Sequence, residues 1–77
     1  MNERAVKEYL MKTDQKFREL ANEHQRFEQE LEQFSGKSFL TPDEQVQRTV
    51  IKKKKLVLKD KMQLLIHRYR VQQQAAS

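Results

Sequence analysis

Apolar side chains recur along the first half of the chain at alternating steps of four and three residues, and seven of the nine positions are apolar. The positions are Val6, Leu10, Thr13, Phe17, Leu20, His24, Phe27, Leu31 and Phe34. A repeat of about 3.5 residues keeps one stripe of a helix facing a partner helix over many turns. The spacing therefore predicts an amphipathic helix over about residues 3–34 that packs against another helix.

Thr13 and Asp14 are the weak point of this helix. Their side-chain oxygens compete for backbone N–H groups and suit an N-cap better than a helix interior. Either a new helix begins there or the helix continues through a soft spot. We expect a continuous helix in which the first ten residues fray.

Stop and start signals follow this first helix. Gly36, the only glycine, suits a left-handed C-cap, and residues 41–44 (TPDE) combine an N-cap threonine, a first-turn proline and the glutamate of a capping box. We predict a loop over about residues 35–41, a second helix over about 42–70 and a frayed tail at 71–77, all in one domain, 1–77. We expect Phe39 and Leu40 to fold back over the end of the resulting antiparallel hairpin.

The second helix carries more apolar surface than one partner helix can cover. Its main apolar face spans roughly 160°, and Leu56 and Ile66 fall outside even that sector. The residues of the face are Val46, Val50, Ile51, Val57, Leu58, Met62, Leu64, Leu65 and Tyr69. The surplus predicts an all-α fold in which two coiled-coil-like hairpins form a dimeric four-helix bundle.

His24 is the one polar residue among those that we expect to form the core and interface. The set is Leu10, Phe17, Leu20, His24, Phe27, Leu31, Ile51, Leu58, Met62 and Leu65. With the loop centred near Ser38, His24 lies near Lys52. We interpret His24 as a partly buried residue that is hydrogen-bonded across the helix pair. A zinc site would need three or four ligands, and none is nearby, so no metal is expected.

Composition excludes several classes of protein. There is no cysteine, which excludes disulfides and thiolate metal sites and fits a reducing cytoplasm. No apolar run approaches the roughly 18 residues of a membrane span, and the N-terminus lacks a signal-peptide core. We expect a soluble cytoplasmic protein. A chain of 77 residues has a thin core, so self-association or a partner is the expected source of extra stability.

Two segments resemble a known family. Residues 51–62 (IKKKKLVLKDKM) and residues 20–31 (LANEHQRFEQEL) resemble the YdcH-like family of small bacterial proteins, a domain of unknown function. The resemblance extends over about residues 10–69 and implies a helical hairpin without an assigned activity. Members often have a proline near the position of Gln15. Its absence here argues against a separate N-terminal helix.

Charge is divided between the two halves of the chain. Residues 1–34 carry six Lys/Arg and eight Asp/Glu, whereas residues 42–77 carry nine and three, and the net charge is +5. Two segments of opposite sign favour pairing, although each exposed ion pair contributes only about 0–1 kcal/mol.

The lysine run of the second helix is the candidate anion-binding site. The candidate residues are Lys52, Lys53, Lys54, Lys55 and Lys59. Four consecutive lysines spread over about 300° of a helix, so Lys52, Lys55 and Lys59 share one stripe, while Lys54 lies on another with Lys61. A nucleic-acid backbone could bind by counterion release, but no aromatic residues are interleaved for base stacking.

No cluster of nucleophile, base and second acid is present, so we expect no enzyme activity, catalytic residue or cofactor. The expected function is helix-mediated protein–protein interaction or self-assembly, with a homodimer favoured and another cytoplasmic helical protein as the other possible partner. The alternative is a basic nucleic-acid-associated protein. Hairpin pairing argues against a helix that lies on a membrane.

Overall fold

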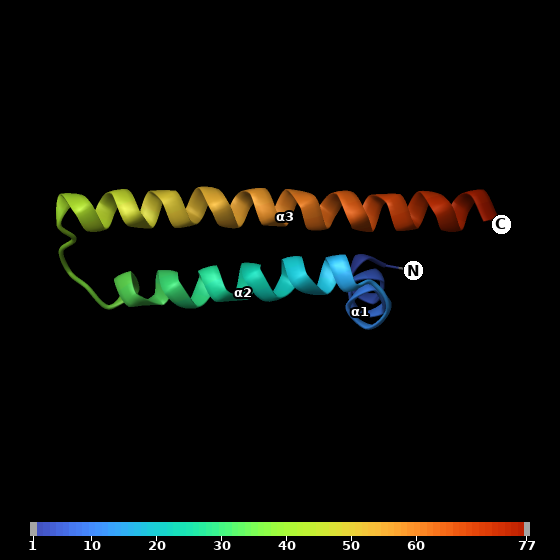
Figure 1. The fold of residues 1–77 in the computed structure, drawn as a ribbon, viewed down its shortest axis with the longest axis horizontal. Coiled ribbons are helices and arrows are strands. Elements are labelled where there is room, and N and C mark those ends of the chain that lie inside the picture. The colour runs from blue at the N-terminus through green and yellow to red at the C-terminus, as the bar shows by residue number, and fades with distance from the viewer. Residues whose placement is uncertain (1, 77) are drawn as a thin grey trace.

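The computed structural model describes residues 2–76, which form three helices and no strand within that range (Figure 1). The helices are α1 (Glu3–Thr13), α2 (Gln15–Ser35) and α3 (Pro42–Ala76). The all-helical prediction is confirmed. α2 and α3 lie side by side and run in opposite directions, whereas α1 lies across them at the start of α2, where Figure 1 shows it almost end-on. The molecule is elongated, with extents of 54 × 20 × 17 Å.

The expected continuous helix over residues 3–34 is wrong, because the chain breaks at Asp14. Its backbone is extended, with φ −116° and ψ 108°. The Asp14 carboxylate accepts a hydrogen bond from the backbone N–H of Phe17 at 3.0 Å and so caps α2. The backbone N–H of Asp14 donates to the carbonyl of Leu10 at 2.8 Å and closes α1. Asp14 therefore ends one helix and starts the next without a proline at Gln15.

The break directs α1 into the core. The first ten residues, which we expected to fray, are helical from Glu3 and include Val6, which is 0% exposed. Val6 and Leu10 form a buried cluster with Phe17 and Ile66. Burying a Val or Leu side chain stabilises by about 1.5–3 kcal/mol, more than the roughly 1 kcal/mol of a backbone hydrogen bond lost at a break.

Burial on α3 also differs from the expected pattern at Ile66. This residue lies outside the main apolar face, yet it is 2% exposed, because α1 supplies a second packing surface for α3. Nearer the loop, Leu20, Phe27 and Leu58 form the other buried cluster. Three partly buried residues pack against that second cluster: Ile51, Met62 and Leu65. The core thus has two centres, the first where α1, α2 and α3 meet and the second further along α2 and α3 toward the loop.

The loop over residues 36–41 begins and ends close to the predicted points, but two expectations for it are wrong. Gly36 is not left-handed, since its φ is −86° and its ψ is −1°. Phe39 does not cover the end of the helix pair, because its side chain is 78% exposed. The capping box is confirmed: the Glu44 N–H donates to Thr41 Oγ1 at 3.2 Å, and the Thr41 N–H donates to Glu44 Oε1 at 3.1 Å.

α3 is displaced along α2 relative to the symmetrical arrangement that we expected. Lys55 Nζ lies 3.1 Å from Glu28 Oε1, whereas a loop centred near Ser38 would place Arg48 there, about two turns earlier. The start of α3 accordingly projects beyond the end of α2 (Figure 1). Val46 lies in this projecting part and is 63% exposed.

The opposite end of α3 is longer than predicted. The expected frayed tail over 71–77 is helical through Ala76, and Ser77 lies outside the described residues. Gln73 Nε2 donates to the Tyr69 hydroxyl at 2.9 Å, and the Tyr69 ring centroid lies 5.0 Å from that of Tyr9 in α1. Glutamine and alanine are good helix formers, so the helix continues without an apolar face of its own.

The capping box predicts a pH dependence of stability. The Lys37 side chain and then the Thr41 backbone N–H, which both bond to the Glu44 carboxylate, hold its pKa below the ordinary value of 4.5. Because the pKa is lower in the folded state, this contribution is present above pH 4.5 and is lost as the pH falls through the lowered value. Urea unfolding at neutral and acid pH should show that acid lowers the free energy of unfolding less for Glu44→Gln than for the unmodified chain.

Asp43→Asn is the matched control for that variant. It also removes one negative charge from the first turn of α3, but no hydrogen bond to the loop. We expect Asp43→Asn to keep the acid sensitivity of the unmodified chain. If acid lowers the free energy of unfolding equally in all three proteins, the capping box does not contribute to the pH dependence.

Candidate functional site

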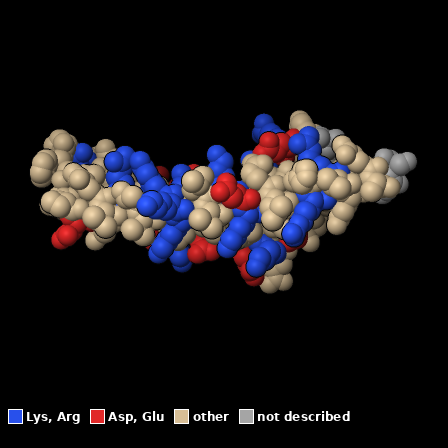
Figure 2. Space-filling view, turned by 90° about the horizontal axis from the view of Figure 1, so that it is seen from above, with Lys and Arg blue, Asp and Glu red and all other residues tan. Residues whose placement is uncertain are grey.

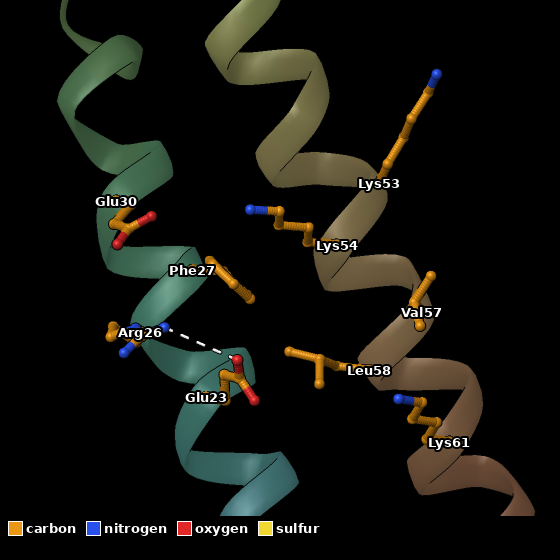
Figure 3. A pocket seen from close by; sticks show the side chains of 9 residues that line it. All are labelled: Glu23, Arg26, Phe27, Glu30, Lys53, Lys54, Val57, Leu58 and Lys61. Carbon is orange, nitrogen blue, oxygen red and sulfur yellow. Dashed lines mark ion pairs between the residues drawn. The ribbon is translucent and has the colours of Figure 1, made fainter.

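Of the grooves that lie along α2 and α3, two together contain the five candidate lysines. The larger, which we name the Phe27 groove, has a volume of about 660 Å³ and is open to solvent. Its lining is Glu23, Arg26, Phe27, Glu30, Lys53, Lys54, Val57, Leu58 and Lys61 (Figure 3). The smaller, the His24 groove, has a volume of about 280 Å³ and is lined by His24, Leu31, Lys52, Lys55, Leu56 and Lys59.

The two walls of the Phe27 groove have opposite charge. α2 contributes the carboxylates of Glu23 and Glu30, and α3 contributes three lysines, with Phe27 and Leu58 between them (Figure 3). Arg26 Nη2 lies 3.8 Å from Glu23 Oε1, and its guanidinium carbon lies 5.4 Å from the centre of the Phe27 ring. This contact shields part of the ring by a cation–π interaction. The groove thus combines an apolar floor with one acidic wall and one basic wall.

We had expected His24 to bond across the helix pair, but its contact is with its own helix. Its Nδ1 lies 3.9 Å from Glu28 Oε1, one turn along the same helix, and this contact is an ion pair only when the imidazole is protonated. The interaction across the pair comes from Lys55, which contacts the same Glu28 oxygen at 3.1 Å. The His24 side chain is 21% exposed. The link between α2 and α3 at this level is therefore carried by Glu28 and Lys55.

The lysine run is divided between the two grooves. Lys52, Lys55 and Lys59 line the His24 groove, whereas Lys53 and Lys54 line the Phe27 groove. Only Lys55 of these five makes an ion pair within residues 2–76. Figure 2 shows Lys and Arg along the middle of the molecule on its α3 side, between ends with few charges. The run therefore offers positive charge on several faces of α3.

Apolar residues also follow one line along the exposed side of α3. We name Val50, Val57, Leu64 and Val71 the α3 stripe; they recur every seven residues, and each is 42–52% exposed. The sequence predicted a surplus apolar face but assigned Val71 to a frayed tail. The seven-residue interval was the signal that could have identified all four as one line.

The described residues show no other concentration of reactive groups. No group of three or more His, Cys, Asp or Glu in residues 2–76 could hold a metal ion. In the same part of the chain, none of the helices combines the length and the apolar character that a membrane span requires.

These features define a small all-helical protein with charged grooves and an exposed apolar stripe. Residues 17–66 match the family described as "Protein of unknown function (DUF465)", and the chain belongs to this family. The resemblance to YdcH-like proteins is confirmed, and both motifs that carry it lie within the matched residues. The match leaves α1 outside. No curated protein and no solved structure matches the chain.

Proposed function

We propose that this protein is a non-catalytic module for helix-mediated self-assembly, in which the hairpin of α2 and α3 completes a four-helix bundle. The α3 stripe is the observation that carries the proposal. Singly exposed apolar residues are ordinary on protein surfaces. Four of them at seven-residue intervals along one helix supply the repeated positions of a coiled-coil seam.

The packing within the chain supports this proposal. Leu58 and Ile66, the buried residues of α3, are 7% and 2% exposed and pack in the clusters formed with α2 and α1. The stripe residues lie on another side of the same helix and stay about half exposed. A small two-centred core gains stability when such a surface is covered, since short chains bury a small fraction of their surface alone.

The test compares two glutamate substitutions on α3. Leu64 lies on the stripe and is 48% exposed, and Leu56 lies off it and is 57% exposed. Leu64→Glu places a charge in the proposed interface and should weaken self-association at least about tenfold, since one unpaired buried charge costs more than the 1.4 kcal/mol of a tenfold change. Leu56→Glu should leave association unchanged. The measurement is the molar mass in solution at several protein concentrations.

A common result for the two variants would contradict the proposal. If Leu64→Glu and Leu56→Glu both keep the mass of the unmodified chain, the stripe does not form the interface. If both variants dissociate to the same extent, the effect comes from added charge on α3 and not from the stripe.

The alternative function, binding of nucleic acid, is favoured by one observation. Lys52, Lys53, Lys54 and Lys59 make no ion pair within the described residues, so their charge is available to phosphates. Binding to duplex DNA should then fall steeply with salt and be lost when the four residues 52–55 are changed to glutamine. Binding that survives this change, or that does not depend on salt, would remove the alternative.

A further inference from the structure

We infer that the protein binds an acidic amphipathic helix of another protein along the face of the hairpin that contains the His24 groove. This binding goes beyond self-assembly and does not require it. Four cations follow one line on this side of α3, and hollows with few acidic residues adjoin them. We name Arg48, Lys52, Lys55 and Lys59 the basic line.

The basic line has the spacing of residues that flank the contact between two packed helices. Its members recur at steps of four, three and four, so they lie within about 60° of one another round α3 and extend over about 16 Å along it. Residues beside a coiled-coil seam recur at the same steps and form ion pairs with the partner helix. Acidic residues at these steps on a partner helix can therefore reach the whole line.

Two hollows adjoin the His24 groove and share lining residues with it. Toward α1, a hollow of about 190 Å³ shares two members of the basic line with the groove and adds Lys7. Toward the loop, a hollow of about 380 Å³ shares Lys52 and adds Lys37 and Arg48. Among the described residues that line the three hollows, Glu28 is the one carboxylate. The two end lysines each already pair with a glutamate, so the basic line is the part left for a partner.

Three members of the basic line keep their charge available to a partner. Lys55 pairs with Glu28 at 3.1 Å, whereas Arg48, Lys52 and Lys59 are exposed and make no ion pair within residues 2–76. The lysines of the Phe27 groove differ, because an acidic wall from α2 lies opposite them. A partner that carries carboxylates is therefore attracted to the His24 side of the hairpin more than to the Phe27 groove.

The apolar part of the His24 groove favours a polypeptide over a nucleic acid. Leu31 and Leu56 line the groove, and Leu56 is 57% exposed, so apolar side chains of an amphipathic helix can cover it. The two rings in the three linings belong to Phe34, which is 6% exposed, and His24, whose side chain is 21% exposed. They offer little surface for base stacking. The occupant that fits is a helix with both acidic and apolar side chains.

The basic line and the α3 stripe lie on different sides of α3. At about 100° per residue, their mean directions are about 160° apart round the helix axis. An acidic helix on the basic line and a second copy on the stripe can therefore be bound together. Leu64→Glu, which tests the stripe, should change the affinity for the acidic helix by no more than about threefold, because exposed charges on opposite sides of a helix are screened.

A defined acidic peptide tests the inference. The probe is a labelled peptide of about 20 residues with glutamates at steps of four, three and four and leucines beside them, long enough to form a helix. Its fluorescence anisotropy on titration with the protein gives the Kd. Arg48→Gln, Lys52→Gln and Lys59→Gln, combined in one variant, remove the unpaired charges of the basic line. Binding should weaken at least about tenfold, since three ion pairs with the peptide are lost.

The matched control variant combines Lys53→Gln, Lys54→Gln and Lys61→Gln. It removes the same number of charges from α3, but from the lining of the Phe27 groove. Binding of the peptide should weaken by no more than about threefold, because only the long-range charge changes. Far-ultraviolet circular dichroism should show the helix content of the unmodified chain in both variants, since glutamine is a good helix former.

Three outcomes would overturn the inference. Equal weakening in the two triple variants would show that the peptide responds to net charge and not to the basic line. Equal binding of a second peptide, with glutamine in place of each glutamate, would show that carboxylates are not recognised. If the unmodified chain binds duplex DNA but not the acidic peptide, and the basic-line variant loses the DNA, this face binds nucleic acid instead.

Discussion

Replacing Phe17 with alanine is expected to remove a large part of the protein's free energy of unfolding. The side chain is 1% exposed and lies where all three helices meet, in the cluster with Val6, Leu10 and Ile66. Removing a buried phenylalanine ring costs about 3–5 kcal/mol. A chain of this size has roughly 4–12 kcal/mol of stability in total, so this loss takes much of it. Urea unfolding followed by far-ultraviolet circular dichroism measures the change.

Phe39→Ala is the matched control, because it removes the same ring from the loop, where the side chain is 78% exposed. Its effect should stay within about 0.5 kcal/mol. Equal destabilisation by the two substitutions would show that Phe17 is not in the core. An unchanged stability of Phe17→Ala would contradict the position of α1, since α1 covers that ring.

The second large effect is expected for Ile66→Ala. Ile66 is 2% exposed because α1 packs on this side of α3, and truncating it should cost about 2–5 kcal/mol. Leu56→Ala removes a side chain of the same size from the same helix, where it is 57% exposed. The control should change the free energy of unfolding by about 0.5 kcal/mol or less. If the two variants are equally stable, α1 does not cover Ile66 in solution.

The parts of the fold that follow from local chemistry could be predicted from the sequence. The alternation of four and three residues indicated the buried line that contains Leu20 and Phe27, because it depends only on helix geometry. The capping box of Thr41 and Glu44 could be predicted for the same reason, since its donors and acceptors lie within one turn.

The break at Asp14 could not be predicted in this way. An aspartate inside a helical pattern can be a soft spot or a cap, and the two differ by about 1 kcal/mol locally. The choice is decided by the burial of Val6 and Leu10 against Ile66, which is 60 positions from Val6 in the sequence. The burial of Ile66 could not be predicted for the same reason, because it depends on where α1 lies.

The site was predicted only in part because its geometry depends on the path of the loop. The end of α2 near Phe34 and the start of α3 at Pro42 could be predicted, but the displacement that pairs Glu28 with Lys55 could not. That displacement decides which lysines line each groove. The division of the lysine run between two faces was predictable, since it follows from the angle between successive residues on a helix.

α1 gives this chain a feature outside the family match. The matched residues begin at Phe17 and end at Ile66, and these two residues belong to the buried cluster that α1 completes with Val6 and Leu10. The N-terminal helix therefore covers the open end of the family's matched segment. It leaves the α3 stripe exposed, since Val57 and Leu64 remain 52% and 48% exposed in its presence.

The molar mass of the unmodified chain in solution tests self-assembly through α3 most directly. Light scattering over a wide range of protein concentrations, at low and high salt, gives this mass without a label or a substitution. We expect twice the chain mass of 9.3 kDa throughout the accessible range. A mass of 9.3 kDa at every concentration and both salt levels would contradict the account, because the α3 stripe would then have no second copy to cover it.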